Sequence, residues 1–490
     1  MSSRKERLTF GHGIVGLVPS NTKVAAALAH EPGPVRLTRI ETWDWAWGGL
    51  LMFSVLLFFR PQDQIRGLGA LHLSDLAAAV GLGAMVFLNL SRGKPLTRMT
   101  PELAGVLALG AVILLTVPTS FWPGGSVSVF LNYYVKVGLI FMLMVNAVTS
   151  PKRLERICWI IVLAFGLVCA RAWLDYARGA HMYEGNRVGG AVGGFFQNPN
   201  DLALNIAAFL PIALMYAKRP GPFLTRALCA GIVVLMLGTL VFTKSRSGLI
   251  GAGAMLATFV VVSRSLTPGT ILAGVVAGMI VLPALPESFY ERMASIADEK
   301  KDETGSREAR RRLLEQALIV FLENPVTGIG AGQFRNYDPE GRAEAWRVTH
   351  NVLLQMAAEL GIFGLLVFSF LIFRAFSAAW WTRRALAWTQ QAHGPPSRYG
   401  RWRAGRRGAT EVDPEDGLEP HERVYLQTHA TAIFAGMVGW FVCAQFASVG
   451  FNWTFYYMLG LATCAREVVK ARAKAYAEAK ELARQGVVAA

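Results

Sequence analysis

Apolar segments about as long as a lipid bilayer is thick recur along this chain, and they limit its fold more than any other feature. A helix crosses a hydrocarbon core of ~30 Å in roughly 20 residues, and only helices or closed barrels satisfy their backbone hydrogen bonds there. The apolar pattern within the segments is helical and not alternating. Hydrophobic residues make up 53% of the 490 residues and charged residues only 17%, which also favours a membrane protein.

The sequence therefore predicts an all-α polytopic membrane protein with about 12 transmembrane helices and a large helical periplasmic loop. The expected spans are residues 44–60, 68–90, 102–121, 129–149, 156–175, 200–217, 224–243, 247–264, 268–285, 351–376, 427–447 and 451–468. No internal repeat is evident, which disfavours a transporter built from inverted repeats.

The basic residues fall mainly on one side of these segments. The net charge is +16, and every second connection carries a basic cluster, as at residues 92–98, 152–156 and 383–407. By the positive-inside rule that side is the cytoplasm, so both termini are expected there. The excess charge then reflects topology and contact with anionic membrane lipids, and no nucleic-acid partner is expected.

This topology divides the chain into five parts. They are a cytoplasmic N-terminal segment without an evident cleaved signal peptide, nine helices, a large periplasmic loop, three helices, and a basic cytoplasmic tail. Their bounds are 1–43, 44–285 with a periplasmic loop at 176–198, 286–350, 351–468 with a flexible cytoplasmic linker at 381–424, and 469–490. The tail from 466 to 484 is expected to continue the last span as a surface helix.

Five cysteines lie within or at the ends of the expected spans, and their spacing shows no pairs. They are Cys158, Cys169, Cys229, Cys443 and Cys464. Small buried core residues are the expected interpretation, with neither disulfides nor metal ligands.

Within the large loop, a helix is expected to begin at its N-cap Ser306 and to end before Pro325. Residues placed 100° apart put six apolar side chains on one stripe, namely Leu313, Leu314, Ala317, Leu318, Val320 and Phe321. The centre of this stripe passes through Arg310, so Arg310 is expected to point inward. Arg312 and Arg311 are instead expected to form exposed pairs with the glutamates four residues away, Glu308 and Glu315.

Arg187 stands among four glycines just before a span, in the segment from Asn186 to Asp201. Glycine permits close approach of the backbone to a ligand. Asn198 and Pro199 fit a helix cap and first helical residue, so they and Asn200 are assigned to structure. Arg187 has two open interpretations, a lipid headgroup anchor and a ligand-binding group.

The turn from Gly328 to Phe334 follows the loop helix, and its glycines allow backbone N–H groups to face an anion. No strand precedes it, and no Lys-Ser or Lys-Thr follows it. The sequence therefore excludes a nucleotide-binding loop of the usual kind.

His350 stands where the polar loop meets the next apolar span. This position lets one imidazole reach both a polar substrate in the loop and a lipid carrier in the bilayer, although an interfacial histidine is the simpler interpretation. The helix N-terminus and neighbouring arginines disfavour the imidazolium form, so His350 is expected to be neutral at pH 7. A neutral histidine can accept a proton, as a general base must.

Four elements in this order resemble the bacterial O-antigen ligase and polysaccharide polymerase superfamily. They are Arg187 with its glycines running into Asn-Pro-Asn; Thr243-Lys-Ser-Arg-Ser-Gly248; Arg310 and Leu314 leading to Asn324-Pro-Val-Thr-Gly-Ile-Gly-Ala-Gly332; and His350-Asn351, nine residues, Gly361, two residues, Gly364. The last element is the most specific, and together they cover about residues 185–364. The chain departs from the family at Leu314, where many members carry tryptophan.

The resemblance implies a metal-independent, inverting glycosyltransferase without a cofactor, in the bacterial inner membrane and with a periplasmic active site. His350 would correspond to the catalytic histidine, and Arg187 and Arg310 to the arginines that hold pyrophosphate. The implied donor is a glycan on undecaprenyl pyrophosphate, and the acceptor is a glycan, a lipid such as lipid A core, or a protein. Second-tier site residues are Arg246, Arg307 as a substitute for Arg310, Gly332 and Asn351.

Three alternatives stay open. A ligase and a polymerase would share this chemistry, and the motifs do not separate them. A transporter or flippase of lipid-linked glycans would also present arginines to phosphate, and should carry ionisable residues near mid-span, for which Lys136 is the main candidate. A noncatalytic assembly scaffold would not require His350.

Overall fold

The computed structural model describes residues 7–9, 36–38, 44–65, 67–183, 186–190, 193–263, 279, 290, 306–337, 347–392 and 417–484. These residues are mostly helical. Two short antiparallel ribbons pair β1 (Arg7–Thr9) with β2 (Arg36–Thr38) and β3 (Met182–Tyr183) with β4 (Arg187–Val188).

The described helices follow the predicted order. They are α1 (Trp45–Phe59), α2 (Pro61–Gln64), α3 (Leu73–Ser91), α4 (Pro101–Thr116), α5 (Pro123–Val129), α6 (Val135–Ala147), α7 (Pro151–Arg178), α8 (Pro199–Lys218), α9 (Phe223–Phe242), α10 (Arg246–Val262), α13 (Ser306–Glu323), α14 (Val352–Ala392), α16 (Pro420–Ala444) and α17 (Trp453–Arg484). Short 3-10 helices lie at Leu68–Leu71, Val117–Thr119 and Gly194–Phe196, and a π-helical turn, Phe130–Tyr134, joins α5 to α6.

Eight helical segments within the described ranges are long and apolar enough to cross a membrane, and the chain is a multi-pass membrane protein. Two more of the predicted spans, α1 and α10, are apolar but shorter. The helix α17 covers the predicted span 451–468 but is not among the eight, and the span predicted at 268–285 lies outside the described residues except for Met279. The described part of the chain thus does not reach the predicted twelve.

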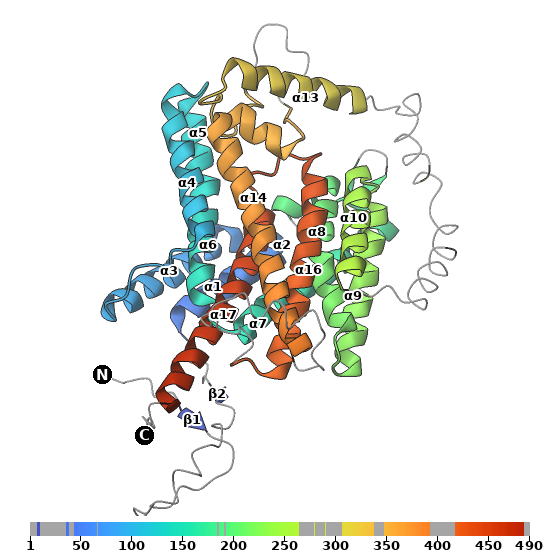
Figure 1. The fold of residues 1–490 in the computed structure, drawn as a ribbon. Coiled ribbons are helices and arrows are strands. Elements are labelled where there is room, and N and C mark those ends of the chain that lie inside the picture. The colour runs from blue at the N-terminus through green and yellow to red at the C-terminus, as the bar shows by residue number, and fades with distance from the viewer. Residues whose placement is uncertain are drawn as a thin grey trace, which may run out of the picture.

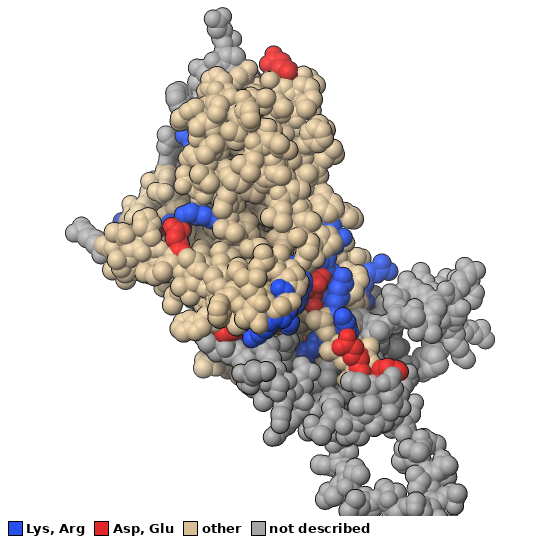
Figure 2. All heavy atoms as spheres, turned by 90° about the vertical axis from the view of Figure 1, so that its left-hand side faces the viewer, with Lys and Arg blue, Asp and Glu red and all other residues tan. Residues whose placement is uncertain are grey.

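One end of the helix bundle is covered by α13, which lies across it at the top of Figure 1, while α17 projects from the opposite end. We call the first the α13 end. Within the bundle, α16 packs against α8, α10 and α14. The left-hand side of Figure 1 is largely uncharged, and most of its Lys, Arg, Asp and Glu side chains gather towards the lower edge (Figure 2). Such an uncharged wall suits contact with lipid.

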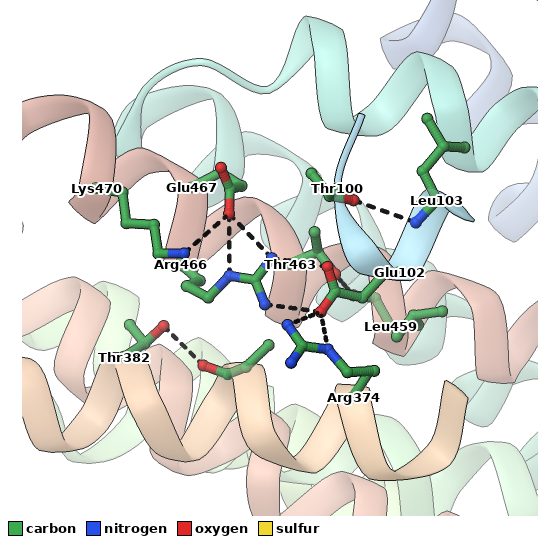
Figure 3. A network of polar contacts seen from close by, with 11 residues as sticks. Thr100, Glu102, Leu103, Arg374, Thr382, Leu459, Thr463, Arg466, Glu467 and Lys470 are labelled. Carbon is green, nitrogen blue, oxygen red and sulfur yellow. Dashed lines mark hydrogen bonds and ion pairs between the residues drawn. The ribbon is translucent and has the colours of Figure 1, made fainter. Parts of the chain in front are cut away.

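A buried ion-pair network ties three helices together at the end remote from α13 (Figure 3). Glu102 of α4 is fully buried, and its carboxylate receives two hydrogen bonds of 2.7 Å from Arg466 of α17 and one of 2.8 Å from Arg374 of α14. Arg466 also donates to Glu467, which lies 3.8 Å from Lys470. Removing one partner from such a network leaves a buried charge uncompensated, so the network fixes how these helices meet.

The helix α14 is broken at Gly361, where φ is 66° and ψ is −163°. The break frees two carbonyl groups, and the loop after α13 uses them: the N–H groups of Ile329 and Gly330 donate to Ala358 and Glu359 at 3.0 and 2.8 Å. In return the N–H of Ile362 donates to Pro325 at 2.8 Å. A broken helix is tolerated inside a membrane protein because neighbouring backbone satisfies the freed groups in this way.

Several predicted features are confirmed and one is wrong. The last span continues as a helix to Arg484, and all five cysteines are free and buried. The linker predicted at 381–424 is too long, because α14 runs on to Ala392 and α16 begins at Pro420 with a capping box between Glu419 and Glu422. The remainder of that linker, residues 393–416, lies outside the described residues.

Candidate functional site

The loop helix α13 packs on an apolar surface at the α13 end. Its side chains Leu313, Ala317 and Val320 are buried against residues of the following loop and of α14, namely Ile329, Phe334 and Ala358. Arg310 continues this row one turn earlier and is half-buried, as its predicted inward direction requires. Leu318 is 47% exposed, so its predicted place on the buried stripe is wrong.

The two ion pairs predicted on the exposed face of α13 are confirmed. Arg311 Nε lies 3.0 Å from Glu315, and Arg312 Nε lies 3.2 Å from Glu308. Exposed pairs of this kind contribute only about 0.3–0.5 kcal/mol each. Of the neighbouring arginines, Arg307 lies on α13 but its side chain is outside the described residues.

His350 is held in a sharp turn immediately before α14. Its φ of 53° lies in the left-handed region, which few residues other than glycine adopt. Its backbone N–H donates to Ser448 Oγ at 3.0 Å, and Ser448 Oγ lies 2.7 Å from the hydroxyl of Thr349. The Thr349 hydroxyl donates in turn to the carbonyl of Asn351 at 3.2 Å. This chain of hydrogen bonds holds the strained turn in place.

The His350 side chain lies in a partly buried, positively charged environment. Burial and the guanidinium groups of Arg310 and Arg347 lower its pKa to about 4, while a hydrogen bond from the ring to the backbone of Phe446 opposes this shift. The imidazole is therefore neutral at pH 7, as predicted from the sequence. Arg310, which is 40 residues away in the chain, and Arg347, which is three residues away, thus both act on His350.

Asn351 caps α14 and ties it to α16. Its Oδ1 accepts from the N–H groups of Leu353 and Leu354 at 3.0 Å each, which satisfies two donors at the start of the helix. Its amide donates to the carbonyl and side-chain oxygens of Gln445 at 3.3 and 3.2 Å. These contacts give Asn351 a structural role beside His350.

Arg187 is bound to the turn between α9 and α10. Its Nε donates to the Thr243 carbonyl at 2.9 Å and its Nη2 to Asn200 Oδ1 at 2.6 Å. Ser245 Oγ donates to the same Asn200 oxygen at 3.0 Å. The first two sequence elements, Arg187 with Asn-Pro-Asn and the turn starting at Thr243, thus form one cluster. Asn198 caps α8 and Pro199 is its first residue, as predicted, whereas the Asn200 side chain also orients Arg187.

Contacts along the end of α16 connect the Arg187 cluster to the His350 turn. Ser245 Oγ lies 3.3 Å from Ser247 Oγ, and Cys443 Sγ donates to the Ser247 carbonyl at 3.4 Å. Gln445, two residues further, is the partner of Asn351. The structure therefore brings the first, second and fourth sequence elements to the same end of the bundle. Arg246, the first residue of α10, lies in the same turn and is half-buried.

The glycine-rich turn presents its backbone N–H groups to the protein itself. Gly332 donates to the buried Glu359 carboxylate at 2.8 Å, and Gly330 donates to the Glu359 carbonyl at 2.8 Å. The acceptor that this turn binds is thus a side chain of α14. Gly332, a second-tier candidate, therefore has a structural part in this conformation.

Lys136, the candidate for a transporter, forms an ion pair instead of standing alone. Its Nζ lies 2.9 Å from Asp75 of α3, and both side chains are a little under half exposed. The π-helical turn Phe130–Tyr134 ends two residues before Lys136.

Four residues near the site were not singled out from the sequence: Arg347, Glu359, Gln445 and Ser448. Glu359, Gln445 and Ser448 act through contacts with distant segments, and no local pattern marks such a contact. Glu359 did carry a usable sign, since a lone carboxylate in an apolar span is a functional candidate by default.

The described residues contain no group of three or more His, Cys, Asp or Glu side chains that could hold a metal ion.

Residues 231–369 match the family model described as O-antigen ligase, and this segment holds the second, third and fourth sequence elements, including Arg310 and His350. No curated protein matches the sequence significantly.

Proposed function

Because residues 231–369 match the O-antigen ligase family, we propose that this chain moves a preassembled glycan from undecaprenyl pyrophosphate to an acceptor hydroxyl on the periplasmic face. At the coarser level it is a membrane enzyme of the O-antigen ligase and polymerase type. The finer proposal assigns the chemistry to His350, Arg310 and Arg187.

His350 acts as the general base in this proposal. The acceptor hydroxyl oxygen attacks the anomeric carbon of the glycan, and the bond from that carbon to the pyrophosphate oxygen breaks. The hydroxyl proton passes to the imidazole, and undecaprenyl pyrophosphate leaves with the bonding electrons. Direct displacement inverts the anomeric configuration. Because one ring nitrogen is engaged by the Phe446 backbone, the other is the proton acceptor.

Arg310 and Arg187 stabilise the charge that develops on the departing pyrophosphate. Guanidinium groups suit this role because they stay charged and bind phosphate oxygens in a planar, two-pronged geometry. Thr243 and Asn200 hold Arg187 before substrate arrives, and the helix that carries Arg310 is held by the buried apolar contacts of α13. Donors fixed in advance are what electrostatic stabilisation of a transition state needs.

The single observation that carries this proposal is the meeting of His350 with Arg310 and Arg347. A neutral base beside two permanent cations is the arrangement that proton removal and a departing pyrophosphate require. The same arginines would make His350 a weak base in the empty site. A bound pyrophosphate offsets their charge, so binding of the donor raises the basicity of His350 at the moment it is needed.

The test is reconstitution of the purified protein in vesicles with a defined undecaprenyl-pyrophosphate glycan. Lipid A core and a second lipid-linked glycan are offered in separate reactions, so that the first reports a ligase and the second a polymerase. If neither acceptor is glycosylated and the donor crosses the bilayer, a transporter replaces this proposal.

A further inference from the structure

Glu359 is a buried carboxylate that the proposed chemistry does not use. It lies within α14, nine residues after His350, and is 4% exposed. A charge is expensive to bury unless hydrogen bonds satisfy it, and an ionisable group inside a membrane span is a functional candidate by default. Its contacts show what it holds.

On one side Glu359 holds the loop that follows α13. Its carboxylate accepts from the backbone N–H groups of Gly332, at 2.8 Å, and of Phe334. Phe334 belongs to the buried apolar cluster in which Leu313 and Ala317 of α13 pack. The position of α13, and with it the position of Arg310, is therefore set by a loop that is bonded to Glu359.

On the other side Glu359 reaches the connection that carries Ser448. Gln355 Nε2 donates to the Glu359 carboxylate at 3.4 Å, and Gln355 Oε1 accepts from the Gly450 N–H at 3.1 Å. Two residues before Gly450, Ser448 accepts the backbone N–H of His350. The base and the arginine thus come from separate segments, and one buried network joins both segments.

We propose that Glu359 is a positioning residue that fixes Arg310 relative to His350 by holding the loop 328–334 and, through Gln355, the turn at Gly450. This inference rests on the proposed roles of His350 and Arg310. Glu359 does not touch the reacting atoms, and it acts as a fixed hydrogen-bond acceptor inside the protein. Removing its acceptor oxygens releases the loop, and α13 then moves as a unit with its arginine.

The experiment compares the full-length wild-type protein with Glu359→Ala and Glu359→Gln, and with Glu315→Ala as the matched control. Glu315 is also a glutamate, but it lies on the exposed face of α13 and pairs with Arg311. Hydrogen exchange of residues 328–334 measures the hold on the loop directly. We expect exchange roughly tenfold or more faster in Glu359→Ala, an intermediate rate in Glu359→Gln, whose oxygen still accepts from Gly332, and no change in Glu315→Ala.

Titration of His350 by nitrogen NMR, with ¹⁵N-histidine, gives a second readout that does not depend on activity. Displacement of Arg310 and entry of water raise the pKa of His350 towards the ordinary ~6.5. We expect the rise. Transfer activity should fall on the order of 10²-fold in kcat, as for a small misplacement of a reacting group.

Unchanged loop exchange together with an unchanged or lowered His350 titration in both Glu359 variants would overturn the inference. If instead the loop is released and the titration rises, while His350→Ala still transfers glycan at the wild-type rate, the positioning network stands and the proposed function fails. The conservative Glu359→Gln keeps the test valid if the alanine variant does not fold.

Discussion

Ser448 and His350 are 98 residues apart in the sequence, yet Ser448 Oγ accepts the His350 backbone N–H at 3.0 Å. The bond matters because His350 has a φ of 53°, a conformation that its neighbours must hold. The connection between α16 and α17 therefore decides where the imidazole points. Each element of the site is fixed in this way by a segment remote from it in sequence.

Ser448→Ala should lower activity without changing the fold. Loss of this hydroxyl leaves the His350 N–H without its partner, which costs about 1–3 kcal/mol where such a group is buried, and leaves the Thr349 hydroxyl bonded to the Asn351 carbonyl. We expect kcat to fall roughly tenfold or more, with the thermal unfolding temperature lowered by a few degrees. Ser91→Ala is the control, since Ser91 is exposed and bonds only the Leu88 carbonyl among its described contacts. Equal effects of the two variants would contradict this account of the turn.

The acid limb of the pH profile of kcat/KM should lie at an unusually low pH. The neutral form of His350 is active and its pKa in the free protein is about 4, so kcat/KM for the donor should stay level from pH 7 to pH 5 and fall only as the pH approaches 4. The limb in kcat should lie at higher pH, because bound pyrophosphate offsets the neighbouring guanidinium charges. A kcat/KM limb near pH 6.5 in the wild-type protein would show that burial and the arginines do not act on His350.

Arg347→Ala tests one of those charges separately. Removing a cation beside His350 raises the pKa of the imidazole, so the acid limb in kcat/KM should move to higher pH than in the wild type. Arg311→Ala removes an arginine that pairs with Glu315 on the exposed face of α13 and should leave the limb in place. The same rate-against-pH measurement reports both variants, and a limb that moves equally in both argues for a long-range effect of net charge.

Arg187→Lys should weaken binding of the donor. One ammonium group cannot reproduce bonds that leave the guanidinium at two nitrogens, towards the Thr243 carbonyl and Asn200. We expect the donor KM to rise about tenfold while the acceptor KM stays unchanged, by initial-rate kinetics with each substrate varied in turn. Arg178→Lys, at the exposed end of α7, is the charge-preserving control. A rise confined to the acceptor KM would show that Arg187 binds the acceptor and would contradict its assignment to the donor.

Much of this structure was predictable where the determinants are local. The pairs Arg311–Glu315 and Glu308–Arg312 depend on helical spacing alone, and Asn198 caps α8 through a bond two residues away. Local pattern failed where distant packing decides. Leu318 fits the helical period, but Phe334 and Ala358 cover only the side of α13 that carries Leu313, Ala317 and Val320. Leu318 therefore stays exposed.

The glycine-rich turn shows that prediction of a binding site from local sequence has the same limit. Its sequence permits backbone N–H groups to face an anion, and the structure shows one that does, bonded to Glu359. Nothing in the spacing separates a substrate anion from a carboxylate supplied by α14. The close approach of Gly361 to the Val326 carbonyl could not be predicted either, because it forms only when the chain is folded.

Gly361→Ala should destabilise the protein strongly. Its backbone lies in a region that is open almost only to glycine, and a Cβ there would meet the Val326 carbonyl oxygen at 2.2 Å. Backbone strain alone costs on the order of 1–3 kcal/mol, and the clash adds to it. Gly253→Ala is the matched control, because it lies in α10 with open space at its Cβ position and should be neutral or stabilising. Thermal unfolding in detergent measures both, and similar stabilities would contradict the break in α14.

The most direct test of the central claim is glycan transfer by His350→Ala in vesicles loaded with the undecaprenyl-pyrophosphate donor and an acceptor. A general base contributes on the order of 10²–10⁴-fold, so product formation should fall by that factor while the variant still binds donor and unfolds at the wild-type temperature. Transfer at the wild-type rate by a folded His350→Ala protein would contradict the claim that this histidine activates the acceptor hydroxyl.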